Sequence, residues 1–202
     1  MSAHSTPLFY DDLDASYEES WRLLVRGKND RRSAFHTPAI ATIGADGVPQ
    51  VRTVVLRGAD QAQAQLRFHT DIRAGKVAEI GAEPKIGLHF YDKKSKIQLR
   101  VSGTAHCHTD GALKDHAWDG SKPMSRECYR VNHSPGSHVM APDAWSIPQD
   151  PSDPDEGKEN FVAVTVTIET MEWLYLARGG HRRAKFFVAA DGALAKATWL
   201  VP

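Results

Sequence analysis

Arg52-Thr-Val-Val-Leu-Arg57 and, a little further on, Phe68-His-Thr-Asp-Ile-Arg-Ala-Gly-Lys76 form the stretch of sequence that decides the fold. The first segment is typical of a strand with an arginine at each end, and the second ends a strand, turns and begins a helix. Together they supply cationic side chains, a hydroxyl and the unpaired N–H groups of a helix start, which are the groups that hold a phosphate. We therefore expect a phosphate-bearing ligand to bind here.

The composition excludes a strong overall electrostatic field. Lys and Arg number 25, Asp and Glu number 25, and the formal net charge of the 202 residues is zero. Nothing draws the whole molecule toward nucleic acid or an anionic membrane, so any anion site must be a local cluster. The two cysteines, Cys107 and Cys128, are too few for a disulfide framework or a zinc site and are expected to be free thiols. With no signal-peptide pattern and no run of membrane-spanning length, the sequence predicts a cytoplasmic protein.

The pattern along the chain predicts mainly hairpin-connected strands. A helix is expected from Asp11 or Asp14 to about Gly27, and further helices over 73–80, 110–118 and 122–132. The expected strands cover 39–43, 48–57, 65–70, 85–91, 96–108, 161–176, 185–189 and 197–201, with Gly103 as a bend or bulge. We predict one mainly β domain over 1–202, an antiparallel barrel with peripheral helices. Within it, residues 1–34 form an arm and a helix, and residues 134–158 form a long loop or flap.

The first cluster of candidate ligand-binding residues lies in the opening stretch. Arg52 and Arg57 are five residues apart, so a regular strand would turn them to opposite faces of the sheet. Thr70 and Lys76, with His69, lie where a strand leads into a helix, and unpaired N–H groups make such a position favourable for an anion. Solvated strand-end charges and an ordinary capped helix are the alternatives. The absence of a glycine-rich phosphate loop argues against a Rossmann or P-loop site.

Three further segments carry polar side chains in suggestive patterns. Gln98 lies on the polar face of an alternating strand and could bond the edge of a polar ring, or simply face solvent. Trp118, Lys122 and Arg126 lie in the two-helix insertion, where an aromatic ring and cations could hold a substrate anion or serve only packing and solubility. His181-Arg-Arg-Ala-Lys185 concentrates positive charge beside a turn, which favours an anion unless it is an exposed patch.

Taken in order, these pieces resemble the pyridoxamine 5′-phosphate oxidase family of FMN-binding split barrels. The resemblance rests on the collinear set Arg52–Arg57, Phe68–Lys76, Ile97–Gly103, Lys122-Pro123, and Trp173 to His181–Phe186 with Trp199–Pro202, and it covers most of the chain from about residue 35. It implies an antiparallel split β-barrel of Greek-key type. It also implies a homodimer that binds FMN at the subunit interface.

The resemblance implies roles for individual residues. FMN contacts are expected from Arg52, Thr53, Val54, Val55, Leu56, His69, Thr70, Lys76, Gln98, Trp173, Tyr175, Arg183 and Lys185. Contacts to a substrate are expected from Arg57, Trp118, Lys122, Arg126 and Arg182. Because the flavin itself carries out the redox chemistry, no side chain is assigned as catalytic, and no metal is expected.

Departures from the family pattern concern the substrate side. Arg57 stands where the family has lysine, Gly75-Lys76 replaces an Arg-Lys pair, and the C-terminal Arg-x-His is not cleanly present. The sequence therefore predicts an FMN-dependent oxidoreductase acting on an unidentified small molecule. Three alternatives stay open. The first is a non-catalytic protein that binds either FMN or haem, the haem through His181 or His106. The others are a genuine pyridoxamine 5′-phosphate oxidase and a flavin or nicotinamide reductase.

Overall fold

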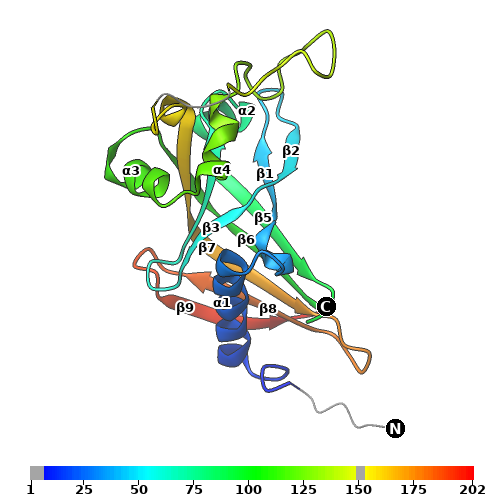
Figure 1. Cartoon of the computed structure of the whole chain (residues 1–202). Helices are drawn as coiled ribbons and strands as arrows, with labels where there is room; N and C mark the ends of the chain where they lie inside the picture. Colours follow the sequence, from blue (N-terminus) through cyan, green and yellow to red (C-terminus); the bar gives the residue numbers. More distant parts are fainter. Residues whose placement is uncertain (1–6, 149–152) are drawn as a thin grey trace.

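The computed structural model describes residues 7–148 and 153–202 and is dominated by one curved antiparallel sheet (Figure 1). The sheet has nine strands in the order β2-β1-β5-β6-β7-β4-β3, with β8 paired to β7 and β9 to β8. The strands are β1 Ala39–Ile43, β2 Pro49–Thr53, β3 Leu56–Asp60, β4 Gln65–Asp71, β5 Lys85–Asp92, β6 Ile97–His108, β7 Phe161–Tyr175, β8 Arg182–Val188 and β9 Leu194–Leu200. The prediction of a mainly β, antiparallel architecture with peripheral helices is confirmed.

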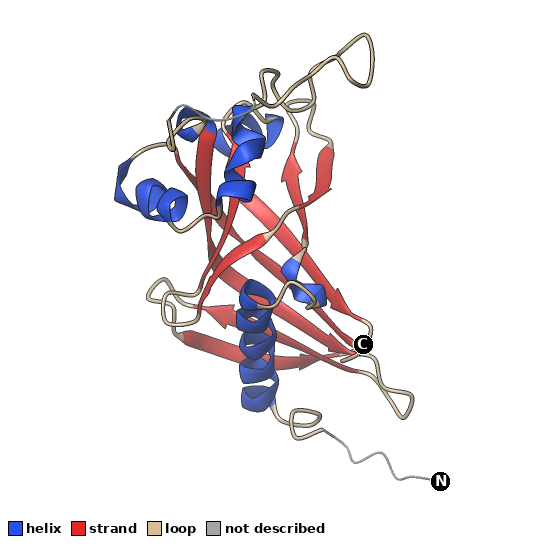
Figure 2. Ribbon diagram, viewed as in Figure 1, coloured by secondary structure: helices blue, strands red, loops and turns tan. Residues whose placement is uncertain are grey.

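The helices cover the two ends of this sheet. They are α1 Leu13–Asn29, α2 Gly75–Ala82, α3 Gly111–Asp119 and α4 Pro123–Arg126, with 3-10 turns at Ala34–His36, Glu127–Arg130 and Lys158–Asn160. Figure 2 shows α2, α3 and α4 gathered at one end, while α1 lies across the other. The predicted helix over 122–132 is wrong in length, because its second half tightens into the 3-10 turn Glu127–Arg130.

Helix α1 begins at a different aspartate from the two that the sequence suggested. Asp12, in an extended conformation, accepts a hydrogen bond from the backbone N–H of Ala15 at 2.9 Å. This satisfies one of the unpaired donors of the first turn. The helix then buries Tyr17, Trp21 and Leu24 against the sheet.

The two strands at the ends of the main path of the sheet, β2 and β3, are consecutive in the chain. The predicted single strand over 48–57 is wrong: β2 ends at Thr53, where it pairs with β1, and β3 begins at Leu56, where it pairs with β4. Between them Val54 and Val55 carry the chain from one edge to the other, and the Val54 N–H donates to the carbonyl of Pro38 at 3.0 Å. The curved sheet is therefore closed by the covalent chain at this gap, not by a ladder of hydrogen bonds between β2 and β3.

The two faces of β6 show how the sequence pattern sorts the interior from the exterior. Ile97, Leu99 and Val101 are buried, whereas the alternating Arg100 and Ser102 are exposed. The core therefore lies on the concave side, and the polar side chains of β6 face outward. The first half of β7 departs from this alternation, because α3 and its neighbours form a second apolar cluster on its other face.

The long segment after α4 is irregular where the structure describes it. Residues 134–148 contain no helix or strand, and residues 149–152 of the predicted flap at 134–158 lie outside the described residues. The division of the chain into one domain with an arm and a flap stays a prediction. None of the helices in the described residues is long and apolar enough to cross a membrane.

Candidate functional site

A half-buried polar cluster brings together side chains from β1, β2, β4 and α2. The Arg52 guanidinium contacts Glu79 Oε2 through Nη2 at 2.6 Å and donates through Nη1 to Thr42 Oγ1. Nearby, Lys76 Nζ donates to Thr70 Oγ1 at 3.0 Å. We call Arg52, Lys76, Thr70, Thr42 and Glu79 the cradle.

Strand register explains why these residues meet. Arg52 lies opposite Ile40, which is fully buried, so both side chains point to the concave side of the sheet. Thr70 pairs with Val162 of β7 and is buried like Phe68 two residues before it, which turns it to the same side. Helix α2 lies across this end and contributes Lys76 from its first turn and Glu79 one turn later.

Electrostatics make the cradle suitable for an anion. Burial lowers the pKa of Lys76, and the charge of Arg52 lowers it further, whereas Glu79 and Asp71 act in the opposite direction. A bound anion would relieve this repulsion. Among the described residues Lys76 donates one hydrogen bond, to Thr70, so its ammonium group retains donors for a ligand. The donor set therefore fits a phosphate group, although Glu79 already occupies part of the Arg52 guanidinium.

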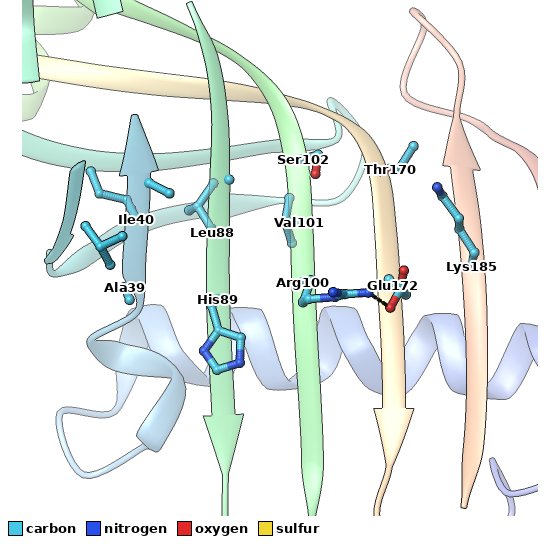
Figure 3. Close-up of a pocket in the computed structure, with 13 residues that line it drawn as sticks. Ala39, Ile40, Leu88, His89, Arg100, Val101, Ser102, Thr170, Glu172 and Lys185 are labelled. Atoms are coloured by element: carbon cyan, nitrogen blue, oxygen red, sulfur yellow. Dashed lines mark hydrogen bonds and ion pairs between the residues drawn. The ribbon is translucent and has the colours of Figure 1, made fainter. Parts of the chain in front are cut away.

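A second feature is a hollow on the convex face of the sheet, with a volume of about 440 Å³ (Figure 3). We call it the outer groove. It crosses β1, β5, β6, β7 and β8, and the small residues Ala41 and Gly87 contribute to its lining. Arg100 pairs with Glu172, which also binds Arg183 at 2.7 Å, and Figure 3 shows Lys185 on the next strand.

The predicted flavin contacts divide between these features and the core. Gln98 lies on the convex side of β6 together with Arg100. Trp173 is fully buried, and its indole N–H has no hydrogen-bond partner among the described residues. Tyr175 packs edge-to-face against Phe9 at 5.4 Å between ring centroids.

The predicted substrate contacts do not form one group. Arg57 and Lys122 line a shared pocket, and His69 lies with them and not in the cradle, because adjacent residues of β4 point to opposite faces. Trp118 is instead fully buried and donates through Nε1 to Asp155 at 2.7 Å. Arg126 lies over the Trp118 ring, 4.6 Å from its centroid.

The C-terminal cations and the histidines considered for haem lie elsewhere. Arg182 pairs with Asp11 at 2.7 Å, and its guanidinium lies 4.1 Å from the Tyr10 ring centroid. His106 packs against His108 on the surface of β6, and His181 is exposed directly before β8. Across residues 7–148 and 153–202, no group of three or more His, Cys, Asp or Glu side chains is placed to hold a metal ion.

Comparison with known proteins identifies the family. A family model described as "Pyridoxamine 5'-phosphate oxidase, FMN-binding domain" matches residues 18–109. The pyridoxine/pyridoxamine 5'-phosphate oxidase of Novosphingobium aromaticivorans is 30% identical over 165 residues, which are 71% of this chain and 75% of that protein. The chain belongs to the pyridoxamine 5′-phosphate oxidase-like family. FMN, the cofactor of the matched domain, is the cofactor that the sequence predicted.

Solved structures support the same fold. A pyridoxamine 5'-phosphate oxidase-related, FMN binding protein from Nostoc punctiforme PCC 73102 has a TM-score of 0.76 and 21% identity, covering 98% of this chain and 100% of that one. PhzG from Burkholderia lata 383, in complex with tetrahydrophenazine-1-carboxylic acid, has a TM-score of 0.71 and 20% identity, with both chains fully covered. The split-barrel prediction is confirmed. The chain spans about half the length of some other curated relatives, 51% and 50% for those from Bradyrhizobium diazoefficiens and Azorhizobium caulinodans.

Within this family member, sequence reasoning missed two residues of the cradle. Glu79 lies three positions after Lys76 on the predicted helix, and that spacing could have placed it on the same face. Thr42 lies in a short strand whose pattern does not separate it from its neighbours. Its contact with Arg52 depends on the pairing of β1 with β2, which the sequence alone does not specify.

Proposed function

We propose that this protein is an FMN-dependent oxidoreductase that works as a homodimer on a small molecule not yet identified. The observation that carries the proposal is the cradle, where Arg52, Lys76 and Thr70 present two cations and a hydroxyl at the meeting point of β2, β4 and α2. In an FMN-binding family, this is the donor set that the phosphate of the cofactor requires.

The remaining roles follow from where the chain places its polar groups. The backbone of Thr53–Leu56 spans the gap beside the cradle and would lie along the bound ring system. Lys185 is the stronger candidate for a cation near that ring, because Arg183 is already held by Glu172. A fixed positive charge stabilises negative charge that develops on a bound group. FMN, when bound, supplies the hydride and electron chemistry.

We propose that the partner subunit of the homodimer binds at the outer groove. Val51 leaves 67% of its surface exposed on this face, beside Ala41 with its single methyl group and Gly87 with no side chain, which allow close approach. In the dimer we propose, Gln98 and Lys185 of one chain complete the site of the other, whereas Tyr175, opposite the buried Ile97, faces the concave side of its own sheet. Trp173 has no exposed surface in the single chain, so its role would be to support Tyr175, with which it stacks at 6.1 Å.

The first test is the visible spectrum of the protein as purified, followed by titration with FMN. Flavin absorption bands support the proposal, a Soret band would instead indicate haem, and a colourless protein that does not take up FMN would overturn it. Two further tests identify the electron donor. Bleaching of the flavin bands by NAD(P)H would indicate a reductase, and conversion of pyridoxamine 5′-phosphate in the presence of oxygen would indicate an oxidase for that compound.

A point variant tests the cradle itself. Arg52→Ala should weaken FMN affinity by about 1.5–3 kcal/mol, the scale of a lost charge-assisted hydrogen bond. Arg22→Ala is a matched control, because Arg22 also pairs with a glutamate, Glu19 at 2.6 Å, but on the exposed side of α1. Equal FMN affinity for the Arg52→Ala variant and the control would remove Arg52 from the site.

A further inference from the structure

We propose that His106 and His108 together bind one divalent late transition-metal ion, with Cu²⁺ as the preferred ion, at a position distinct from the cradle and the outer groove. Both histidines lie near the end of β6, two residues apart. Side chains two positions apart on a strand point to the same face of the sheet. We call this pair the histidine site.

The first observation is the spacing of the two imidazole rings. Their centroids lie 4.6 Å apart, and their planes are inclined at 71° to each other. Two imidazole rings that share one metal ion have centroids roughly 4–5 Å apart, because each metal–nitrogen bond is only slightly longer than 2 Å. The rings of His106 and His108 are therefore already close enough to bind the same ion.

The second observation is a hydroxyl on the neighbouring strand β7 that orients one of the rings. His108 Nε2 lies 2.8 Å from Oγ1 of the buried Thr165. In the tautomer that carries its proton on Nε2, His108 donates to this hydroxyl, and the lone pair of Nδ1 is free for a metal ion. Metal-binding histidines almost always donate their other ring N–H to a neighbouring acceptor in this way. The contact with Thr165 therefore prepares His108 to act as a ligand through Nδ1.

The third observation is that the surroundings favour the neutral imidazole, which is the form that binds a metal ion. Burial, and then the charge of His106, lower the pKa of His108. Neither histidine takes part in any of the ion pairs formed between described residues, so no carboxylate stabilises a charged ring. Little competition from protons is therefore expected near neutral pH.

The ligand set defines the class of metal. In the part of the chain that the structure describes, no third His, Cys, Asp or Glu completes a larger cluster. Thr104, two residues before His106 on the same face, bonds Glu169 at 2.6 Å, and Lys85 also holds that carboxylate. Water would therefore fill the remaining coordination positions. Imidazole with water suits Cu²⁺ best among the divalent ions, whereas zinc sites normally have three or four protein ligands.

The histidine site is separate from the proposed flavin site. Ala105, between the two histidines, is buried on the concave side of the sheet, so His106 and His108 lie on the convex side, away from the cradle. Along β6 the outer groove is lined by residues 100–102, and the histidine site lies beyond the bulge at Gly103. A metal ion here and FMN in the cradle can be bound at the same time, and the inference does not rest on the proposed function.

Copper titration of the full chain as purified, without a histidine tag, tests this inference. Every sample carries His4→Gln, so that the histidine nearest the amino terminus does not compete for the metal. The protein is treated with EDTA, freed of the chelator and titrated with Cu²⁺ near neutral pH, followed by electron paramagnetic resonance. We expect one saturable Cu²⁺ site per chain, with hyperfine splitting from two imidazole nitrogens. Excess Mg²⁺ should not compete, because Mg²⁺ takes oxygen ligands.

Two variants and a control locate the binding. His106→Gln and His108→Gln should each weaken Cu²⁺ binding by about tenfold or more, because chelation by two linked ligands is lost. His138→Gln, which removes an exposed histidine in the segment after α4, should leave the affinity unchanged. His106 is exposed, so its replacement should not impair folding, and circular dichroism checks this.

Three results would overturn the inference: no saturable Cu²⁺ site, a spectrum without two imidazole nitrogens, or equal losses of affinity in His138→Gln and His106→Gln. The flavin absorbance is recorded for every sample and should be the same in His106→Gln as in the protein with both histidines. A protein that neither contains nor takes up flavin but binds one Cu²⁺ through His106 and His108 would contradict the proposed function and support the histidine site. A flavin-loaded protein without such a copper site would do the reverse.

Discussion

Glu79 places a carboxylate against the same guanidinium that we propose for the FMN phosphate. Its Oε2 lies 2.6 Å from Arg52 Nη2, and both side chains are mostly buried. A phosphate in the cradle would therefore lie close to a like charge, which costs binding free energy in a half-buried site.

Replacing Glu79 should strengthen cofactor binding. We expect Glu79→Gln to raise FMN affinity by roughly threefold to tenfold, because it removes the like charge and leaves an amide that can still accept from Arg52. Fluorescence titration of FMN measures the change. Glu83→Gln, at the exposed end of α2, is the control and should leave affinity unaltered. Weaker binding by Glu79→Gln would show instead that Glu79 orients Arg52.

His69 should make stability depend on pH. Burial, together with the positive charges of Arg67 and Arg57, lowers its pKa from 6.5 to about 3. Between these values the unfolded chain binds a proton that the folded chain does not, so stability is greatest above pH 6.5 and falls as the pH decreases toward 3.

The measurement is urea unfolding at several pH values across this window. The His69 contribution to the slope is at most about 1.4 kcal/mol per pH unit. His69→Phe keeps the ring contact with Phe161, whose centroid lies 4.8 Å away, and should flatten the profile between pH 4.5 and 6.5. An unchanged slope in His69→Phe would assign the pH dependence to other groups.

At the scale of single residues, the sequence predicted part of the candidate site. Arg52, Thr70 and Lys76 were recognisable because an anion site needs cations and a hydroxyl at a strand-to-helix junction, although their roles stay predictions. The convergence of Arg57 with Arg67 was not recognisable, because it depends on the pairing of β3 with β4 and the shift of register between Leu56 and Gly58.

Among the elements, β6 and β7 are joined by the longest ladder in the sheet, and it is interrupted by a bulge at Gly103. A β-carbon at Gly103 would collide with the backbone carbonyl of Thr167. The expected bend at this glycine is therefore confirmed, and its physical cause is the close approach of the two backbones.

A substitution at this bulge should destabilise the fold. We expect Gly103→Ala to lower the free energy of unfolding by about 1–3 kcal/mol, since the neighbouring strand must shift to make room. Gly81→Ala in α2 is the control, because its added β-carbon would meet no other atom within 4 Å. Urea unfolding of both variants measures the difference, and equal stabilities would contradict the role given to the bulge.

The element boundaries that were wrong have a common explanation. Val54 and Val55 are β-branched and individually favour strands, so nothing local indicates that β2 stops before them. The break arises from closure of the curved sheet, which requires the chain to pass between its two edges. Likewise, the helix predicted to begin at residue 122 begins at Pro123, but the contacts of Tyr129 in the second apolar cluster determine where that helix ends.

At the scale of the whole molecule, the proposed dimer makes the cofactor site dependent on assembly. We expect Val51→Asp to convert the protein to a monomer and to reduce its FMN content, because a charge in the outer groove would be desolvated at the interface. Size-exclusion chromatography with light scattering, alongside the flavin absorbance, measures both. Val48→Asp is the control: Val48 is also exposed, at 52%, but does not line the outer groove. A dimeric, flavin-loaded Val51→Asp variant would exclude this face.

The central position of β7 has a consequence for the order in which the chain acquires its structure. Strands β1–β2, β3–β4 and β5–β6 are local hairpins, but of the strands in the described residues only β7 pairs the β3–β4 hairpin with the rest of the sheet, and it also pairs with β8. During synthesis, the hairpins therefore emerge long before the strand that unites them. Until Phe161–Tyr175 has left the ribosome, β4 and β6 each expose an unpaired edge, and this interval is when the nascent chain is most open to aggregation.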